Sequence, residues 1–179
     1  MKELWTEKYR PKDLEGYVFK DTQQLEQIAT WVVQESIPHL LFSGAPGVGK
    51  TTLAKILINQ LGIDDYDVLE INASRENSVD TIRDKITGFV QTMPFGKFKI
   101  VLLDEADFLS PNAQAALRGV MEEYHESARF VLTCNYPNKV IPALHSRTQG
   151  FHFDKLDINE FTARVATILL NEGIKFDMD

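Results

Sequence analysis

Apolar residues follow two spacings that alternate along the chain, one typical of amphipathic helices and the other typical of buried strands. The helical spacing predicts four helices, at residues 21–36, 50–61, 78–91 and 111–124. Short apolar runs between them predict five strands, at residues 39–43, 67–71, 100–103, 130–133 and 150–153. Strands that alternate with helices in this way indicate an α/β domain with a mostly parallel sheet.

The last part of the chain carries one more helical stripe, beyond a seam at residues 155–156. Asp157 and Glu160 have the spacing of a capping box, and Gly173 suits the end of the helix. This helix either packs back on the sheet domain or opens a second domain. We therefore expect one unit at residues 1–155 and the start of another within 156–179.

Composition and charge exclude several classes of protein. Of 179 residues, 44% are hydrophobic and 25% are charged, which is typical of a soluble globular chain. No window approaches twenty apolar residues, and the first five residues show no apolar core of a signal peptide. The single cysteine, Cys134, leaves no intrachain disulfide, so we expect a cytoplasmic protein. A net charge of −7 argues against binding to duplex DNA through overall basicity, so such a partner requires a local patch or an assembly.

A phosphate-binding motif lies directly between a predicted strand and a predicted helix. Residues 44–51 match G-x-x-x-x-G-K-[ST], in which backbone N–H groups and the helix N-terminus converge on phosphates. Lys50 would supply positive charge to the β- and γ-phosphates, and Thr51 would supply a hydroxyl for Mg²⁺. The residues predicted to bind ATP here are Gly44, Ala45, Pro46, Gly47, Val48, Gly49, Lys50, Thr51 and Thr52.

Polar residues that end two other predicted strands complete a candidate hydrolytic site. Asp104 and Glu105 follow the strand at 100–103, where Asp104 would hold Mg²⁺ and Glu105 would polarise the attacking water. Asn135 follows the strand at 130–133 and would contact the γ-phosphate or orient water; alternatively it is a turn-forming residue. Residues 104–107 also spell a helicase signature, but the chain lacks the length for two RecA-like domains.

Five motifs in a fixed order narrow the family. They are WTEKYRP at 5–11, INAS at 71–74, DEAD at 104–107, AQAALR at 113–118 and LHSR at 144–147. Over residues 4–179 the chain resembles the clamp-loader AAA+ ATPases, which include replication factor C small subunits and the large subunits of tailed-phage clamp loaders. The resemblance implies a P-loop AAA+ fold with a RecA-like parallel sheet, and the first helix of a helical lid at 156–179. It also implies a five-subunit ring that uses ATP to open a sliding clamp and close it on primer–template DNA during replication.

The same resemblance implies roles for residues outside the phosphate loop. Tyr9, Arg10 and Pro11 would help to form the adenine pocket, and Asn135 would sense the γ-phosphate. Arg147 would be the arginine finger that completes the site of a neighbouring subunit, so a monomer should be weakly active. As an alternative, Arg147 is an ordinary surface arginine.

Three further groups of residues take expected roles from the resemblance. Arg75, Arg83 and Lys85 would contact the backbone of the DNA template. Alternatively they belong to an ordinary solvated surface, where a basic helix start is common. An apolar run would contact the sliding clamp, and its residues are Phe89, Met93 and Phe95. The alternative is that these side chains belong to the hydrophobic core. Gln114 and Arg118 would relay DNA and clamp contacts to the catalytic site; alternatively they are solvated helix residues. Asn72 and Asn77 are candidates for the polar side chain that holds Glu105 away from the site until DNA binds.

The chain departs from the family pattern at three places. Thr148 stands where the family has a cysteine after Ser-Arg, and Gly119 stands where many relatives have a second basic residue. No complete lid follows residue 156, so we expect a fragment. Two other functions stay open: a different AAA+ DNA remodeller of the helicase-loader type, and a scaffold that binds nucleotide without hydrolysis. The presence of both Glu105 and Arg147 argues against the scaffold.

Overall fold

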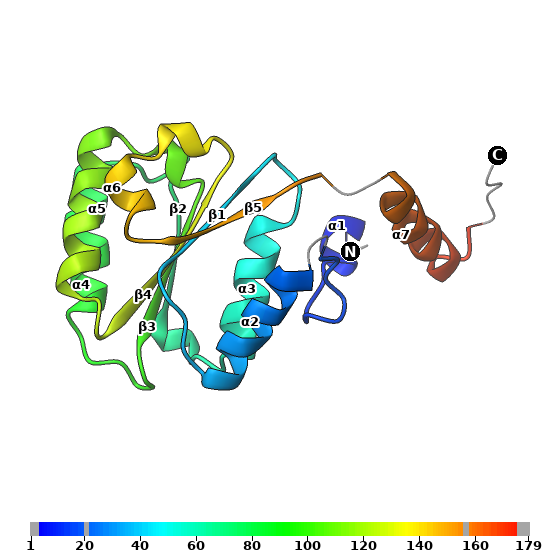
Figure 1. Cartoon of the computed structure of the whole chain (residues 1–179), viewed down its shortest axis with the longest axis horizontal. Coiled ribbons are helices and arrows are strands. Elements are labelled where there is room, and N and C mark those ends of the chain that lie inside the picture. The colour runs from blue at the N-terminus through cyan, green and yellow to red at the C-terminus, as the bar shows by residue number, and fades with distance from the viewer. Residues whose placement is uncertain (1–3, 20–21, 156–157, 175–179) are drawn as a thin grey trace.

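The computed structural model describes residues 4–19, 22–155 and 158–174, and within them five strands form one parallel sheet (Figure 1). The order across the sheet is β2-β3-β4-β1-β5, which places the phosphate-loop strand β1 between β4 and β5. The predicted strands are all present, each within two residues of its expected ends. They are β1 Leu40–Gly44, β2 Val68–Asn72, β3 Lys99–Asp104, β4 Ala128–Cys134 and β5 Gln149–Phe153.

Helices cover both faces of the sheet, with α2 and α3 on one side and α4, α5 and α6 on the other (Figure 1). The longer helices match the predicted ones, whereas α1 and α6 were not predicted because four residues are too few to show a period. The helices are α1 Trp5–Lys8, α2 Thr22–Gln34, α3 Lys50–Gln60, α4 Thr87–Val90, α5 Pro111–Glu123, α6 Pro142–His145 and α7 Ile158–Asn171.

The strands read as continuous apolar runs because both faces of the sheet are buried. Successive side chains point to opposite faces, so Leu40 and Phe42 pack with α2 and α3 while Leu41 packs with the other layer. Leu102 and Leu103 divide in the same way on β3. Because all five strands run parallel, their carboxyl ends lie at one rim of the sheet. An open parallel sheet binds its ligands at this rim.

The predicted helix at 78–91 differs from expectation in its winding. Its central part, Thr81–Ile86, is π-helical, and only Thr87–Val90 is a regular α-helix. Ile82, Ile86 and Val90 are all buried at a spacing of four residues. Residues four apart lie close to one face in α and π turns alike, so the spacing predicts a helix without distinguishing the two, and the buried face packs against α5.

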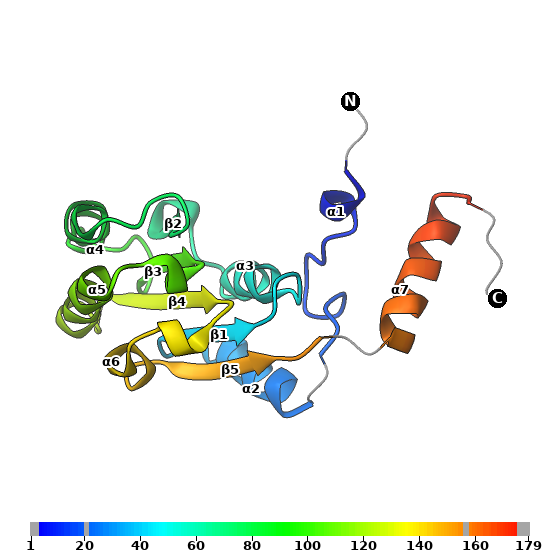
Figure 2. The same ribbon diagram turned by 90° about the horizontal axis from the view of Figure 1, so that it is seen from above.

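The final helix packs on neither side of the sheet. It lies beside α1, apart from the sheet, and its Arg164 donates hydrogen bonds to the backbone oxygens of Gly16 (3.0 Å) and Tyr9 (3.4 Å) (Figure 2). Gly173 takes the positive φ of 70° that suits its predicted capping role. The capping box expected at Asp157 and Glu160 lies outside the described residues. The boundary between two units near residue 155 stays a prediction.

Within the described part of the chain, no helix has the length and apolar character needed to cross a membrane.

Candidate functional site

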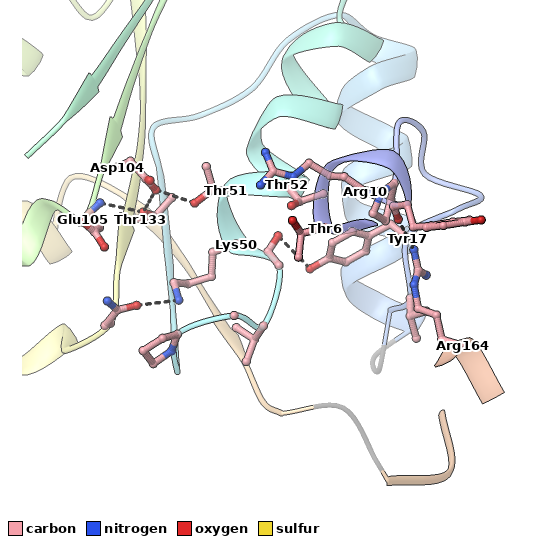
Figure 3. Close-up of a pocket in the computed structure, with 18 residues that line it drawn as sticks. Thr6, Arg10, Tyr17, Lys50, Thr51, Thr52, Asp104, Glu105, Thr133 and Arg164 are labelled. Carbon is pink, nitrogen blue, oxygen red and sulfur yellow. Dashed lines mark hydrogen bonds between the residues drawn. The ribbon is translucent and has the colours of Figure 1, made fainter. Parts of the chain in front are cut away.

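A cavity of about 510 Å³ opens at the carboxyl rim of the sheet, between the phosphate loop and the N-terminal segment, residues 4–19 (Figure 3). It gathers predicted residues from distant parts of the chain, including Tyr9, Arg10 and Pro11 with the loop residues 46–52. Gly44 and Ala45 do not line the cavity themselves. The residues that line it are Thr6, Tyr9, Arg10, Pro11, Tyr17, Val18, Pro46, Gly47, Val48, Gly49, Lys50, Thr51, Thr52, Asp104, Glu105, Thr133, Asn135 and Arg164.

The loop lysine lies at the centre of a hydrogen-bond network. Lys50 Nζ, labelled in Figure 3, donates to Asn135 Oδ1 at 3.0 Å. It also donates to the backbone oxygens of Gly44 and Ala45, both at 2.8 Å. Burial lowers the pKa of Lys50 below its ordinary value. Three acceptors match the three N–H groups of an ammonium, so the side chain is held at the loop by protein groups alone. The contact also joins the phosphate loop to Asn135, as the order of strands predicts.

The backbone of the loop takes conformations that favour glycine. Gly47 and Gly49 have φ values of 78° and 96°, which a residue with a side chain adopts only at a cost. A Cβ on Gly49 would also lie 3.0 Å from the hydroxyl of Tyr17. That hydroxyl donates to Gly49 O at 3.4 Å, and burial raises the pKa of Tyr17 to about 12. Tyr17 therefore braces the loop from the N-terminal segment.

Two threonines and an aspartate form the candidate metal end of the cavity. Thr51 Oγ1 donates to Asp104 Oδ1 at 2.6 Å, and Thr133 Oγ1 donates to the same oxygen at 2.5 Å. Thr133 Oγ1 also accepts from the backbone N–H of Glu105 at 3.0 Å. A carboxylate beside a hydroxyl supplies the hard oxygen ligands that Mg²⁺ prefers, and Mg²⁺ sites are usually completed by substrate phosphates and water. The residues present thus fit the predicted ion.

Glu105 has a φ of 58°, one of two positive values among the described non-glycine residues. Left-handed backbone is costly for a glutamate and persists where surrounding contacts enforce it, as Thr133 does here. Such residues cluster at active sites. The conformation places Glu105 at the wall of the cavity.

Comparison with known proteins decides the family. A family model described as "ATPase family associated with various cellular activities (AAA)" matches residues 40–154, which include the loop, Asp104, Glu105 and Asn135. This chain belongs to the AAA family. Membership implies nucleotide binding, and the predicted P-loop AAA+ fold is confirmed.

Curated relatives of this AAA chain carry one shared name. It is 46% identical to a replication factor C small subunit from Sulfurisphaera tokodaii, over 97% of this chain and 54% of that protein. It is 42% identical to the one from Methanocella arvoryzae, over 99% and 56% respectively. The predicted resemblance is confirmed, and the chain spans about half the length of the curated relatives it matches.

Solved structures support the AAA fold alone. The Holliday junction branch migration motor RuvB of Thermotoga maritima superposes with a TM-score of 0.76 at 16% sequence identity. The match covers 94% of this chain and 56% of that one. An identity this low shows that the architecture is shared, and the chemistry of the AAA site has to be argued from its residues.

A buried aspartate supports the turn that carries Asn135 in the AAA site. Asp107 is only 7% exposed, and its Oδ2 accepts the backbone N–H groups of Asn135 at 3.3 Å and Tyr136 at 3.1 Å. These bonds fix the chain as it leaves β4. The alternative of Asn135 as a residue that only forms a turn does not explain its contact with Lys50.

Arg147 lies outside the cavity of its own AAA domain. Its guanidinium donates to Glu122 Oε1 from Nε at 2.9 Å and from a terminal nitrogen at 2.5 Å, and Arg118 lies 3.5 Å from the same oxygen. The hydrogen bond from Arg147 lowers the pKa of Glu122. An arginine that completes a neighbour's site has to lie away from its own, so this position suits the finger role, which stays a prediction.

Of the predicted relay residues, Gln114 is placed differently from expectation. It is 1% exposed, and its amide donates to the backbone oxygens of Leu109 (3.1 Å) and Lys139 (3.0 Å) and accepts from the N–H of Ile141 (2.8 Å). The interpretation of Gln114 as a solvated helix residue is therefore wrong, because these three backbone groups need a buried partner. Arg118, four residues later, is exposed as expected.

Within the part of the chain that the structure describes, the other two predicted relay residues make no hydrogen bond to Glu105 that would hold it. Asn72 Oδ1 accepts from the backbone N–H and the hydroxyl of Ser74, and Asn77 is exposed. Their role stays a prediction.

The candidate DNA and clamp residues lie before, on and after the π-helical segment at Thr81–Ile86. Arg75, Arg83 and Lys85 are all exposed, and Lys85 pairs with Glu76 at 2.7 Å. The candidate clamp residues divide. Phe89 packs against the core, whereas Met93 is 88% exposed and Phe95 is 81% exposed, so the core interpretation is wrong for these two.

Thr133, Asp107, Tyr17 and Arg164 make hydrogen bonds in or beneath the site and were not predicted, and neither were Thr6 and Val18, which line the cavity. Thr133 had a signal, since it is polar at the end of an apolar strand that neighbours the Asp104 strand. Asp107 had a weaker one, as the last residue of the motif at 104–107. Tyr17 and Arg164 had none, because they contact backbone oxygens and come from segments outside the sheet.

Proposed function

We propose that this AAA chain is a Mg²⁺-dependent ATPase that forms the hydrolytic part of a clamp-loader subunit in DNA replication. The observation that carries the proposal is the convergence of Lys50, the Thr51–Asp104 pair and Asn135 in one cavity. The names of the curated relatives support the biological setting.

ATP would bind with its two halves at opposite ends of the cavity. We call the part lined by Lys50, Thr51, Asp104, Glu105 and Asn135 the phosphate end. The part lined by Thr6, Tyr9, Arg10, Pro11, Tyr17 and Arg164 is the base end. Lys50 would turn from its two carbonyl partners toward the β- and γ-phosphate oxygens. Bound Mg²⁺, held by Thr51 and Asp104, would neutralise charge on those phosphates.

Hydrolysis would proceed by attack of water on the γ-phosphorus. Glu105 orients the water and accepts its proton, while the bond to the β–γ bridging oxygen breaks to give ADP and phosphate. Thr133 fixes the backbone of Glu105, and Asp107 fixes the turn from which Asn135 reaches the γ-phosphate. Arg147 would add its charge across a subunit interface, to the site of a neighbour.

The assembly would be a five-subunit ring that binds a sliding clamp and primer–template DNA. Exposed Arg75, Arg83 and Lys85 suit contacts with the DNA backbone, which are independent of sequence. Three charges bind weakly in one subunit, but several subunits that present them together bind more strongly through avidity. Exposed Met93 and Phe95, followed along the chain by the buried Phe98, suit insertion into an apolar surface pocket of the clamp.

The decisive experiment measures ATP turnover by the chain alone, then with clamp, primed DNA and a full-length partner subunit. We expect stimulation by clamp and DNA together, and its loss in Glu105→Gln and Arg147→Ala. Stimulation by DNA without dependence on the clamp would instead identify a remodeller of the helicase-loader type. Background turnover in the assembly with ATP binding intact would identify a scaffold that does not hydrolyse ATP.

A further inference from the structure

We propose that Arg164, on α7, is a positioning residue that fixes the base end of the cavity. It would act through the N-terminal segment, by holding two backbone oxygens of that segment in place. The inference rests on the proposed function, because it takes the ligand to be ATP.

The guanidinium of Arg164 closes a loop of the N-terminal segment. It donates to Gly16 O at 3.0 Å and to Tyr9 O at 3.4 Å, and it also lines the cavity (Figure 3). The chain between these two residues has no helix or strand, so no ladder of backbone hydrogen bonds shapes it. A planar fork with donors on both terminal nitrogens bridges two carbonyls in a fixed geometry. Arg10 and Pro11, which line the cavity, lie inside the bridged loop.

A second contact ties the residue that directly follows α7 to the same segment. Glu172 accepts from Lys8 Nζ at 2.5 Å and from the hydroxyl of Tyr9 at 2.8 Å. The hydrogen bond to Glu172 raises the pKa of Lys8. Arg164 lies within α7 and Glu172 directly follows its last residue, so the helix and its end hold the segment at two points.

These ties are the contacts that set the shape of the base end. The segment reaches the sheet domain through Tyr17, whose hydroxyl bonds Gly49 O at the edge of the loop. Thr6, Tyr9, Arg10 and Pro11 precede Tyr17 along the segment, and they line the cavity together with Arg164 of α7. The phosphate end, in contrast, is built from β1, α3, β3 and β4, and its hydrogen bonds include no residue of α7. Loss of Arg164 should therefore weaken recognition of the base and leave recognition of the phosphates intact.

The test compares two ligands that share the phosphate chain. Calorimetry measures the Kd of Mg-ATP and of Mg-tripolyphosphate, which lacks base and ribose, for the chain and its Arg164→Gln variant. We expect the Kd for ATP to rise about tenfold, as for loss of a charge-assisted hydrogen bond, and the Kd for tripolyphosphate to stay within about twofold. Arg164→Lys should be intermediate, because an ammonium does not bridge both carbonyls in the same plane.

Matched variants separate this effect from general damage. Thr167→Ala removes an exposed α7 hydroxyl that bonds only within the helix, to Ala163 O, and should change neither Kd. Lys50→Ala should weaken both ligands, because it acts at the phosphate end. Thermal unfolding without ligand checks that Arg164→Gln folds, and Arg164→Lys replaces it if it does not.

The outcomes distinguish a failure of the positioning role of Arg164 from a failure of the proposed function. Equal loss of both ligands in the Arg164 variants, or no loss of either, overturns the positioning role, while ATP binding by the unaltered chain keeps the nucleotide binding on which the proposed function depends. Failure of the unaltered chain to bind Mg-ATP overturns the proposed function, and the positioning role with it.

Discussion

The phosphate end and the base end of the cavity are built in different ways. At the phosphate end, Lys50, Asp104 and Asn135 stand at the ends of packed strands or at the first turn of a helix, and their hydrogen bonds are buried or half-buried. At the base end, the walls come from the N-terminal segment and α7, whose mutual contacts are largely exposed. Buried bonds in a rigid sheet preorganise a site, whereas exposed ion pairs contribute little stability each.

The difference assigns separate tasks to the two ends. A fixed phosphate end holds the catalytic groups in one geometry, as in-line attack on phosphorus requires. The base end is assembled from the N-terminal segment and α7, so its shape depends on the contacts between these two segments. Because such binding is reciprocal, a nucleotide that orders the base end also fixes α7 relative to the sheet domain.

Removal of the loop lysine should break the phosphate end most severely. Lys50→Ala deletes the ammonium that bonds two loop carbonyls and Asn135, so we expect ATP affinity to fall at least about a hundredfold. Lys55→Ala is the matched control, because Lys55 is an exposed lysine on the same helix and pairs with Glu70 at 2.8 Å. Calorimetric titration with Mg-ATP measures both, and tight binding by Lys50→Ala would contradict this assignment of the phosphate end.

The phosphate end was predictable from sequence because its parts are marked locally. The loop is one contiguous motif, and Asp104 and Asn135 each end an apolar strand, so the parallel sheet brings them together. The base end was predictable only in Tyr9, Arg10 and Pro11, through the family motif. Tyr17 and Arg164 act on backbone oxygens, which every residue has and no sequence pattern distinguishes.

The same limit explains the two main differences in the fold. Helical spacing placed Gln114 and Arg118 on one side of α5. It could not show that the backbone at residues 139–141 packs over Gln114 and hydrogen bonds to its amide. Spacing also predicted a helix near Ile82 and Ile86 without its π winding, because apolar residues four apart suit both α and π turns.

The support beneath Asn135 offers a smaller perturbation of the phosphate end. Asp107→Ala leaves the N–H groups of Asn135 and Tyr136 without their acceptor, which should destabilise the domain by about 1–3 kcal/mol. Because Asn135 then loses its orientation, we expect kcat for ATP to fall about tenfold with KM little changed. Urea unfolding and steady-state turnover in the assembly measure the two effects.

Asp107→Asn separates geometry from charge at this position. It keeps one oxygen to accept both N–H groups, so it should retain most of the stability and of kcat if the role is geometric. A loss in Asp107→Asn equal to that in Asp107→Ala would show that the carboxylate charge matters instead.

The smallest expected effect lies away from both ends, at the amino end of β1. Burial, with the nearby Arg129 charge, lowers the pKa of His39 from 6.5 to about 4, and His39 Nδ1 accepts the backbone N–H of Phe130 at 3.1 Å. The unfolded chain takes up a proton as the pH falls through this window and the folded chain does not, so the free energy of unfolding decreases from pH 6.5 toward pH 4. Partial exposure reduces the contribution to about 1–2 kcal/mol.

His39→Gln keeps an acceptor for Phe130 but does not titrate, so urea unfolding across this pH range should show a flatter slope. Its affinity for Mg-ATP at neutral pH should equal that of the unaltered chain, since neither end of the cavity contains His39. An unchanged slope would place the acid sensitivity in other groups. A changed affinity would show that the amino rim of the sheet is coupled to the cavity, and the independence of the two ends from the rest of the sheet would then fail.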